Sequence, residues 1–224
     1  MTDECKVKIK EIFTSVQGEG PYVGYKQLFI RFCNCNLKCN YCDTDFKDDN
    51  YEEFDTERLL ERINRYSNYH SISLTGGEPL LSVDFLKTFL PRTGKKIYLE
   101  TNATLADKFR EVKPFIDIVS ADIKLESATG IKDSYKFHDK FFANCKGVET
   151  FAKIVFNKNI KDEEIEICCD LGSRHGVELI LQPEMQNDLM IVTPEFAEEI
   201  LDKFLQHYSN VRLIPQVHKF LNLK

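Results

Sequence analysis

Cys35-Asn36-Leu37-Lys38-Cys39-Asn40-Tyr41-Cys42 places three cysteines at spacings of four and three residues. A loop of this length can fold around one metal centre and present three thiolates from one side. Thiolates are the ligands that iron–sulfur clusters and zinc prefer. A structural zinc site and an ordinary four-iron cluster each take four protein ligands. Three cysteines therefore leave one metal position open for chemistry.

A fourth thiol near this loop leaves two interpretations open. Cys33 could compete with Cys35 as the first ligand, but the spacing to Cys39 and Cys42 favours Cys35. The alternative is a partial zinc site that Cys33 or a distant histidine completes, since zinc knuckles use similar loops.

Length and composition favour one α/β domain over residues 1–224, with 42% hydrophobic residues and a formal net charge of −6. The negative charge and the lack of a Lys/Arg run argue against nucleic acid as a partner. The charged N-terminus does not resemble a signal peptide, and no apolar run approaches membrane-spanning length. We therefore expect a cytoplasmic protein without a membrane partner, whose eight cysteines are thiols or metal ligands.

Apolar segments alternate with amphipathic ones along most of the chain, which is typical of parallel βα units. The predicted strands are residues 27–32, 71–74, 96–99, 116–121, 152–156, 177–181 and 211–217. The predicted helices are residues 56–66, 82–90, 105–115, 162–174 and 193–208. These strands are too few for an eightfold barrel, so the predicted fold class is α/β, a partial, open parallel βα barrel of about six strands with reduced helical decoration.

Two other stretches carry weaker predictions. Residues 43–55 are acidic and polar and are expected to form a surface loop. The segment 135–151 is rich in aromatic residues that are expected to be exposed, as a dimer face or a lid. These are Tyr135, Phe137, Phe141, Phe142 and Phe151.

Polar residues follow most of the predicted strands. In parallel α/β folds the carboxyl ends of the strands meet at one rim, where functional groups collect. Residues 76–79, 100–102, 120–124, 182 and 216–218 are predicted to share that rim with the cysteine loop.

The cysteine loop, with Tyr41 before its last thiol, and the segment Gly76-Gly77-Glu78-Pro79 together resemble the radical S-adenosylmethionine (SAM) superfamily. This resemblance implies a [4Fe-4S] cluster on Cys35, Cys39 and Cys42, with SAM chelating the fourth iron. The SAM-binding residues that it implies are Tyr41, Gly76, Gly77, Glu78, Asn102, Ser120, Lys124 and Gln182. Lys124 read by itself could equally be a surface lysine.

Three further segments resemble the narrower family of 7-carboxy-7-deazaguanine synthases. They are Gln17-Gly18-Glu19-Gly20, Cys42-Asp43-Thr44-Asp45-Phe46 and Gln216-Val217-His218-Lys219. The resemblance implies 6-carboxy-5,6,7,8-tetrahydropterin as substrate, Mg²⁺ on Thr44, a flavodoxin or ferredoxin as electron donor, and a homodimer. The substrate-binding residues that it implies are Gln17, Gly18, Glu19, Arg31, Thr75, His218 and Lys224, the last through its terminal carboxylate.

The chemistry of these side chains suits a pterin. The Glu19 carboxylate can accept two hydrogen bonds from an amidine-like edge, and Gln17 offers both a donor and an acceptor. The planar guanidinium of Arg31 matches a substrate carboxylate. Taken without the family, Glu19 capping a turn and Arg31 pairing with Asp43 or Asp45 are the favoured readings.

The resemblance implies radical chemistry in which SAM is cleaved and regenerated, and it assigns no catalytic side chain beyond the cluster and SAM. A glycyl-radical activating enzyme shares the cysteine loop, but the segment Gln17–Gly20 argues against it. A non-catalytic iron–sulfur or zinc module is the third reading, and Gly76-Gly77-Glu78-Pro79 argues against that one.

Overall fold

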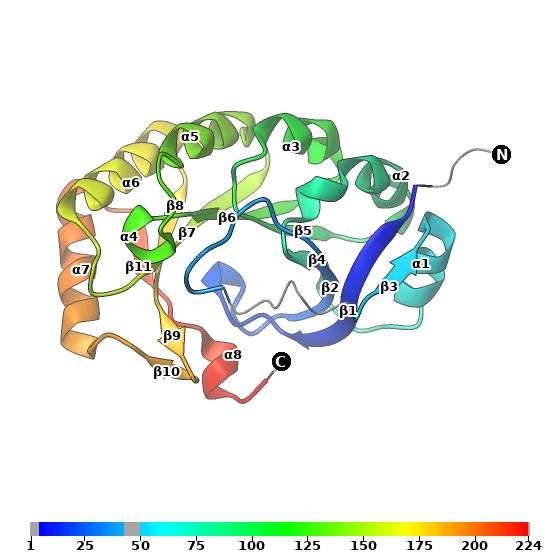
Figure 1. Ribbon diagram of the computed structural model, residues 1–224, viewed down its shortest axis with the longest axis horizontal. Helices are drawn as coiled ribbons and strands as arrows, with labels where there is room; N and C mark the ends of the chain where they lie inside the picture. The colour runs from blue at the N-terminus through cyan, green and yellow to red at the C-terminus, as the bar shows by residue number, and fades with distance from the viewer. Residues whose placement is uncertain (1–4, 43–49, 224) are drawn as a thin grey trace.

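Seven parallel strands form the centre of the protein in the computed structural model, which describes residues 5–42 and 50–223. They follow the order β2-β4-β5-β6-β7-β8-β11 across one curved, open sheet (Figure 1). Their bounds are Lys26–Phe32 (β2), Ser71–Gly76 (β4), Ile97–Thr101 (β5), Ile118–Ile123 (β6), Glu149–Phe156 (β7), Glu178–Pro183 (β8) and Val211–Leu213 (β11). The predicted partial parallel barrel is confirmed.

The helices lie along the outer, convex side of the sheet (Figure 1). They are α1 (Thr56–Ile63), α2 (Val83–Thr93), α3 (Ala106–Val112), α5 (Tyr135–Asn144), α6 (Asp162–His175) and α7 (Pro194–His207). Their apolar faces and the almost fully buried strands make one hydrophobic core. Strands covered on both sides need continuous apolar runs, which is why the sequence shows these strands so clearly.

The sheet is wider than the sequence predicted, with nine strands among the described residues instead of about six. Strand β1 (Val7–Val16) pairs antiparallel with β2, and β3 (Glu52–Phe54) pairs antiparallel with β1. The register of β1 shifts between Ile9 and Glu11, which is a β-bulge or a related irregularity. This shift breaks the apolar–polar alternation that would have identified the strand. Strand β3 lies within residues 43–55, which were predicted to form a surface loop, so part of that prediction is wrong.

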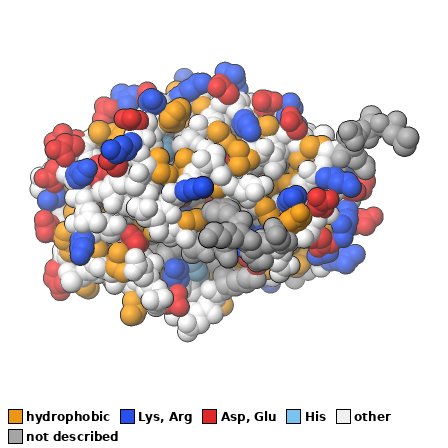
Figure 2. All heavy atoms as spheres, in the orientation of Figure 1, with side chains coloured by type: hydrophobic (Ala, Val, Ile, Leu, Met, Phe, Trp, Pro, Cys, Tyr) orange, Lys and Arg blue, Asp and Glu red, His pale blue; other side chains and the backbone are white. Residues whose placement is uncertain are grey.

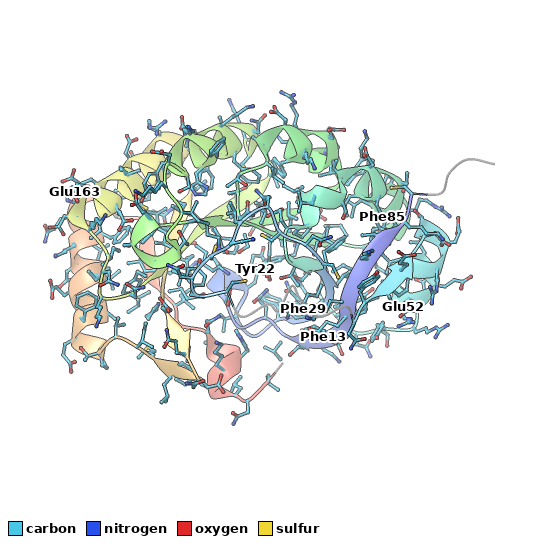
Figure 3. All side chains as sticks on the ribbon, in the orientation of Figure 1. Phe13, Tyr22, Phe29, Glu52, Phe85 and Glu163 are labelled. Atoms are coloured by element: carbon cyan, nitrogen blue, oxygen red, sulfur yellow. The ribbon has the colours of Figure 1, made fainter. Side chains whose placement is uncertain are left out.

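The pair β1–β2 also supplies part of the wall of the cavity described below. Phe13 of β1 and Phe29 of β2 stack with ring centroids 5.2 Å apart (Figure 3). Stacked rings across an antiparallel pair stabilise its register. The antiparallel strands therefore do more than extend the sheet at its edge.

The last predicted strand ends earlier than expected. Residues 211–217 were predicted to be extended, but β11 stops at Leu213. Ile214 donates one more hydrogen bond to Leu181, and Pro215 then has no N–H with which to continue the ladder. The short helix α8 (Val217–Phe220) follows instead.

Several short elements complete the chain. They are the helix α4 (Glu126–Thr129), the hairpin β9 (Met185–Gln186) and β10 (Leu189–Met190), and the 3-10 turns η1 (Gly20–Tyr22), η2 (Pro79–Ser82) and η3 (Lys113–Phe115). The hairpin and α8 lie on the same side of the molecule in Figure 1.

The expectation of exposed aromatics in residues 135–151 is wrong for three of the five. Phe141, Phe142 and Phe151 are buried. Phe141 packs on Phe109 of α3 with ring centroids 4.7 Å apart, and so holds α5 to its neighbour. Phe137, which is 46% exposed, remains on the surface. The sequence of this segment did not reveal which of its aromatic side chains would face the hydrophobic core.

The surface shown in Figure 2 carries basic and acidic side chains interspersed over the outer helices. No helix in the described part of the chain has the length and apolar content that crossing a membrane requires.

Candidate active site

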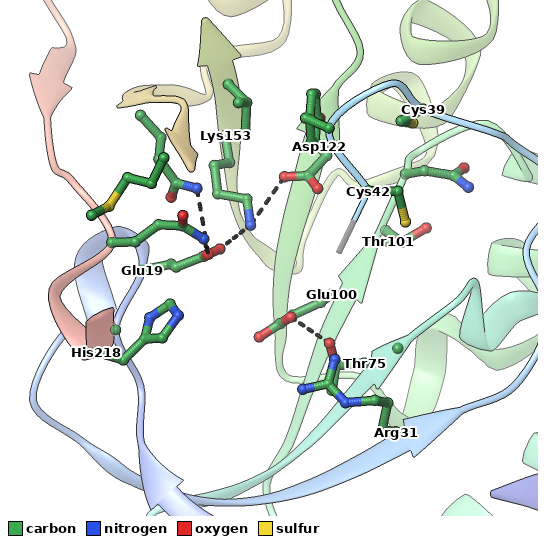
Figure 4. A pocket seen from close by; sticks show the side chains of 18 of the residues that line it. Glu19, Arg31, Cys39, Cys42, Thr75, Glu100, Thr101, Asp122, Lys153 and His218 are labelled. Carbon is green, nitrogen blue, oxygen red and sulfur yellow. Dashed lines mark hydrogen bonds and ion pairs between the residues drawn. The ribbon is translucent and has the colours of Figure 1, made fainter. Parts of the chain in front are cut away.

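A cavity of about 260 Å³ opens at the carboxyl ends of the parallel strands. Its wall includes the cysteine loop, the glycines after β4, the end of β6, the middle of β7, the end of β8 and the segment before α8. The predicted rim therefore exists, and its two ends differ in character. One end holds the thiols and the other holds Glu19 (Figure 4).

Cys35, Cys39 and Cys42 all line the cavity. The Cys35 sulfur accepts hydrogen bonds from the Leu37 amide at 3.5 Å and the Asn102 side-chain amide at 3.7 Å. Asn40 N donates to the Thr129 carbonyl at 3.1 Å and ties the loop to α4. Burial raises the pKa of the Cys35 and Cys39 thiols. Three thiols on one wall, with amide donors to one sulfur, can hold a metal cluster.

Within residues 5–42 and 50–223, no three His, Cys, Asp or Glu side chains converge as ligands of a single metal ion. An iron–sulfur cluster binds each thiolate through a different iron, so its ligands surround a volume and do not meet at a point.

Gly76 and Gly77 pass directly against the cysteine loop. Gly76 has a φ of +111°, a conformation that favours glycine. A Cβ on Gly77 would lie 1.7 Å from the Asn34 carbonyl oxygen. The backbone is fixed there because Gly77 N donates to Phe32 O and Glu78 N to Asn34 O. Glycine is required at Gly77 because another chain segment occupies the side-chain position.

Glu78 lies behind this wall, fully buried, and does not line the cavity. Its carboxylate accepts hydrogen bonds from Thr101 Oγ1 at 2.9 Å and from the amides of Asn102 at 2.8 Å and Leu80 at 3.1 Å. Burial raises its pKa to about 7, although the amides of Asn102 and Leu80 oppose the rise. Glu78 therefore acts on the cavity by fixing Asn102, which does line it.

Lys124 points into the cavity and is not the surface lysine that the sequence allowed. Its Nζ donates to Asp122 Oδ2 at 2.8 Å and to the Tyr41 hydroxyl at 3.0 Å. His138 of α5 holds its backbone, because Lys124 N donates to His138 Nε2 at 3.0 Å. Burial lowers the pKa of His138 to about 4, so this imidazole is neutral and Nε2 can accept.

Glu19 dominates the other end of the cavity. Its carboxylate accepts hydrogen bonds from Lys153 of β7, from Gln216 Nε2 at 2.6 Å and from Gln182 Nε2 at 3.4 Å. Burial would raise its pKa, but Lys153 outweighs burial and lowers the pKa to about 2. Glu19 is therefore an anion, with most of its acceptor positions taken by the protein itself.

Gln17 is fixed between two strands and cannot turn freely toward a ligand. Its Nε2 donates to Gln27 Oε1 at 2.9 Å and to Glu100 Oε1 at 3.0 Å. Glu100 also accepts from Thr75 Oγ1 at 2.6 Å and from Ser73 Oγ at 3.2 Å. Glu100 is another carboxylate of the cavity wall, and it accepts hydrogen bonds from these three neutral donors.

The segment around α8 closes the wall of the cavity at the Glu19 end. Val217 N donates to the Gly18 carbonyl at 2.9 Å. The imidazole of His218 lies so close to Gly18 that a Cβ there would be 2.1 Å from Nδ1. Arg31, on the opposite side of this end, binds Glu11 through Nε at 2.7 Å, a contact that does not involve its two terminal nitrogens. The four residues Gly18, Arg31, Thr75 and His218 all line the cavity.

The comparisons with known proteins agree with this arrangement. A family model described as the radical SAM superfamily matches residues 29–171. The 7-carboxy-7-deazaguanine synthase of Geobacter sulfurreducens is 36% identical over 96% of each chain. That of Archaeoglobus fulgidus is 34% identical over 98% of this chain and all of its own. This chain belongs to the 7-carboxy-7-deazaguanine synthase family.

The solved structures support the fold. The crystal structure of QueE from Escherichia coli superposes with a TM-score of 0.65 at 21% identity and covers 95% of both chains. A radical SAM methyltransferase from Sphaerobacter thermophilus gives a TM-score of 0.59 at 13% identity, over 96% of this chain and 74% of its own. The partial barrel is thus common to radical SAM proteins of different activity.

Membership of this family implies a [4Fe-4S] cluster, SAM, a small-molecule substrate and a reductant. The residues present fit the first two. Three thiols share a wall, and the glycine backbone and Asn102 adjoin them. Cys33 does not line the cavity, which agrees with the choice of Cys35 as first ligand.

The other residues that the sequence predicted for this family's site fall into three groups. Those that line the cavity are Gln17, Gly18, Glu19, Arg31, Tyr41, Thr75, Gly76, Gly77, Asn102, Lys124, Gln182 and His218. Glu78 and Ser120 are buried behind the wall. Thr44 and Lys224 lie outside the described residues, so their assignments stay predictions. Gln182 donates to Glu19 and so lies at that end of the cavity, and its predicted contact with SAM stays a prediction.

The sequence analysis placed Glu100, Asp122 and Gln216 at the rim without assigning them a ligand, and it did not mention Lys153, although all four line the cavity. The position of Lys153 in the sequence did indicate a paired buried charge. This residue stands in the apolar run Phe151-Ala152-Lys153-Ile154-Val155, and a lysine inside a buried strand must be paired with an opposite charge.

Proposed function

We propose that this chain is a radical SAM lyase that converts 6-carboxy-5,6,7,8-tetrahydropterin to 7-carboxy-7-deazaguanine with loss of ammonia, a step toward queuosine and other 7-deazapurines. The observation that carries the proposal is Glu19. It is a partly buried anion at the end of the cavity away from the thiols, and Lys153, Gln182 and Gln216 hold it in place. A fixed carboxylate of this kind suits a neutral heterocycle with adjacent N–H donors.

The groups around Glu19 suit the rest of a pterin. The terminal nitrogens of Arg31 can bind the substrate carboxylate in a bidentate manner. Phe13 and Phe29, which also line the cavity, offer apolar surface to a ring system. Thr75 is held by Glu100, so its hydroxyl has a fixed position at the ring edge.

The cluster would be held by Cys35, Cys39 and Cys42, and SAM by the Gly76-Gly77 backbone, Asn102 and Lys124. When bound, the cluster and SAM together supply reversible hydrogen-atom abstraction. The chain's own part is to orient the substrate between Glu19 and the cysteine loop and to exclude water from a reactive intermediate. Orientation of this kind accounts for a large share of such catalysis.

Anaerobic turnover tests this function. Protein reconstituted with iron and sulfide is given SAM, Mg²⁺, dithionite and 6-carboxytetrahydropterin, and the products are read by mass spectrometry. We expect 7-carboxy-7-deazaguanine. Formation of 5′-deoxyadenosine without this product would indicate another radical SAM reaction, such as activation of a glycyl-radical enzyme. Absence of both would indicate a binding module.

The magnesium assignment is a separate part of the proposal. The segment Cys42-Asp43-Thr44 supports it, because Mg²⁺ takes few protein ligands and can be completed by substrate oxygens. Thr44→Ala should lower Mg²⁺ stimulation of turnover but leave SAM cleavage intact, as measured by titrating Mg²⁺ against product and 5′-deoxyadenosine. Stimulation equal to that of the native protein would remove Thr44 from the metal site.

The proposal also includes a flavodoxin or ferredoxin-type electron donor and a role for the Lys224 carboxylate at the substrate. It further includes a homodimer, a cytoplasmic location and a single domain over residues 1–224. The single sheet and shared hydrophobic core support the domain assignment.

A further inference from the structure

Four ionisable side chains alternate in sign along the wall between the two ends of the cavity. Glu19 binds Lys153, Lys153 Nζ lies 3.3 Å from Asp122 Oδ1, and Asp122 Oδ2 accepts from Lys124 at 2.8 Å. Figure 4 shows Lys153 between Glu19 and Asp122. The two lysine side chains are less than a tenth exposed. The row runs from the substrate end to the Tyr41 hydroxyl beside the cysteine loop.

Lys153 is the member that both ends share. Burial acts to lower its pKa, but the carboxylates of Asp122 and Glu19 outweigh burial and hold it well above its ordinary value. It is therefore charged, and its charge is divided between a carboxylate at the substrate end and one at the SAM end.

The contacts in this row are unequal, and that leaves room for a shift. Asp122 Oδ1 is buried and has no hydrogen-bond partner among the described residues, because Lys153 at 3.3 Å forms an ion pair with it but not a hydrogen bond. Gln182 Oε1 is likewise buried without a partner beside Glu19. A buried acceptor without a partner costs free energy, so Asp122 gains if Lys153 moves closer to it.

We propose that Lys153 couples the binding of substrate to the binding of SAM. The inference rests on the proposed function for the identity of the two ligands. Substrate N–H donors at Glu19 compete with Lys153, which then moves toward Asp122 Oδ1. Asp122 thereby holds Lys124 less tightly, and Lys124 becomes available to the SAM carboxylate.

The same shift runs in reverse when SAM binds first. A SAM carboxylate draws Lys124 from Asp122, Asp122 takes Lys153 more fully, and the acceptor positions of Glu19 are released for the substrate. Coupling between two sites is reciprocal by thermodynamic necessity, so each ligand tightens the other by the same factor.

Isothermal titration calorimetry on the cluster-reconstituted protein measures this factor. Without a reductant there is no turnover, so SAM affinity can be measured with and without saturating 6-carboxytetrahydropterin. We expect the substrate to tighten SAM binding by about fivefold or more, the usual lower range of such coupling. In Lys153→Met the ratio should fall to about one, whereas Lys153→Arg, which keeps the charge, should retain most of it.

A matched control is Lys203→Met, which removes an exposed lysine that pairs with Asp162 at 3.1 Å. Its ratio should equal that of the native protein. Lys153→Met leaves two buried carboxylates short of a cation, so circular dichroism must confirm its fold. If it does not fold, Asp122→Asn interrupts the same row and should also bring the ratio to about one.

Either of two results would overturn the coupling. One is a ratio of one in the native protein. The other is an undiminished ratio in a folded Lys153→Met or Asp122→Asn protein. The turnover assay separates this failure from that of the proposed function. A native protein that makes 7-carboxy-7-deazaguanine but shows no coupling loses only this inference.

Discussion

The two ends of the cavity are built in different ways. At the thiol end the Cys35 sulfur accepts hydrogen bonds from neutral amides, the Gly77 backbone packs closely against the cysteine loop, and Asn102 is fixed by the buried Glu78. At the substrate end Glu19 is held by a buried lysine and by side chains from β8 and from the segment before α8. The residues at the thiol end are held mainly by close packing, and Glu19 at the other end is held mainly by charge.

This difference predicts what each end tolerates. A cluster needs thiolates in fixed positions, and a backbone that cannot move supplies them. A substrate must enter and leave, and ion pairs can exchange partners at a cost that close packing does not allow. Mutations of the cluster ligands should therefore be all-or-none, and those at the substrate end graded.

Cys39→Ala tests the all-or-none end and should have the largest effect. It should abolish cluster binding while the fold is retained, because the hydrophobic core does not include this loop. Iron analysis and circular dichroism measure the two properties. Cys33→Ala is the matched control and should keep its iron. Four irons in the Cys39 variant would show that another thiol is a ligand.

Glu19→Gln tests the charged end. An amide offers one acceptor where the carboxylate offers two, and its NH₂ group would face the donors of the substrate and of Lys153. Charge-assisted hydrogen bonds contribute roughly 1.5–3 kcal/mol each, so we expect substrate affinity to fall about tenfold to several hundredfold. SAM affinity measured without substrate should not fall, because the loss of this charge releases Lys153 toward Asp122 and leaves Lys124 available to SAM. Unchanged substrate affinity in calorimetry would remove Glu19 from the site.

Two glycine substitutions compare the ends directly. Gly77→Ala places a methyl group against the Asn34 carbonyl, and Gly18→Ala places one against His218. We expect the first to weaken SAM and the second to weaken substrate, each by about tenfold, which corresponds to about 1.4 kcal/mol of lost binding.

Calorimetry with both ligands separates the two glycine variants. Gly94→Asn is the control, because nothing lies within 4 Å of the side-chain position and its φ of +56° suits asparagine. A Gly18→Ala protein that loses SAM and substrate affinity equally would contradict the division into two ends.

Acid should also weaken the charged end. The pKa of Glu19 is about 2 in the folded protein and 4.5 without its partners. Ionised Glu19 therefore stabilises the fold above pH 4.5, and this contribution is lost as the pH falls toward 2. Between pH 5 and pH 3 the loss should be about 2 kcal/mol of the unfolding free energy.

Urea denaturation at the two pH values measures this loss in the native protein and in Glu19→Gln. The variant should lose about 2 kcal/mol less than the native protein over the same interval. Equal losses would place the acid sensitivity elsewhere in the chain.

The same contrast explains what the sequence could reveal. The cysteine loop and Gly76-Gly77 are contiguous motifs whose spacing is dictated by their chemistry, so their shared wall was predicted. Buried parallel strands were found for a similar reason, since their apolar runs are continuous. Strand β1 was missed because the shift in register between Ile9 and Glu11 disrupts its alternation.

The hydrogen-bond partners of Glu19 could not be predicted from contiguous motifs. Lys153 and Gln216 stand 134 and 197 residues from Glu19, and their pairing depends on which strands become neighbours. Lys153 was identifiable as a buried charge, but its partner was not. Gln182 was assigned to SAM from its place at the end of a strand. Such a place indicates that a residue lies at the rim of the sheet, but not which end of the cavity it faces.

The long separation between Glu19 and Gln216 also orders events during synthesis. Chains grow at about 5–20 residues per second, so roughly 10 to 40 s separate the appearance of Glu19 from that of Gln216. Over that interval the cysteine loop and the strands beside it can already fold, while the wall around Glu19 lacks its last hydrogen-bond donor. A nascent chain would thus be able to acquire its metal cluster well before it could retain a substrate.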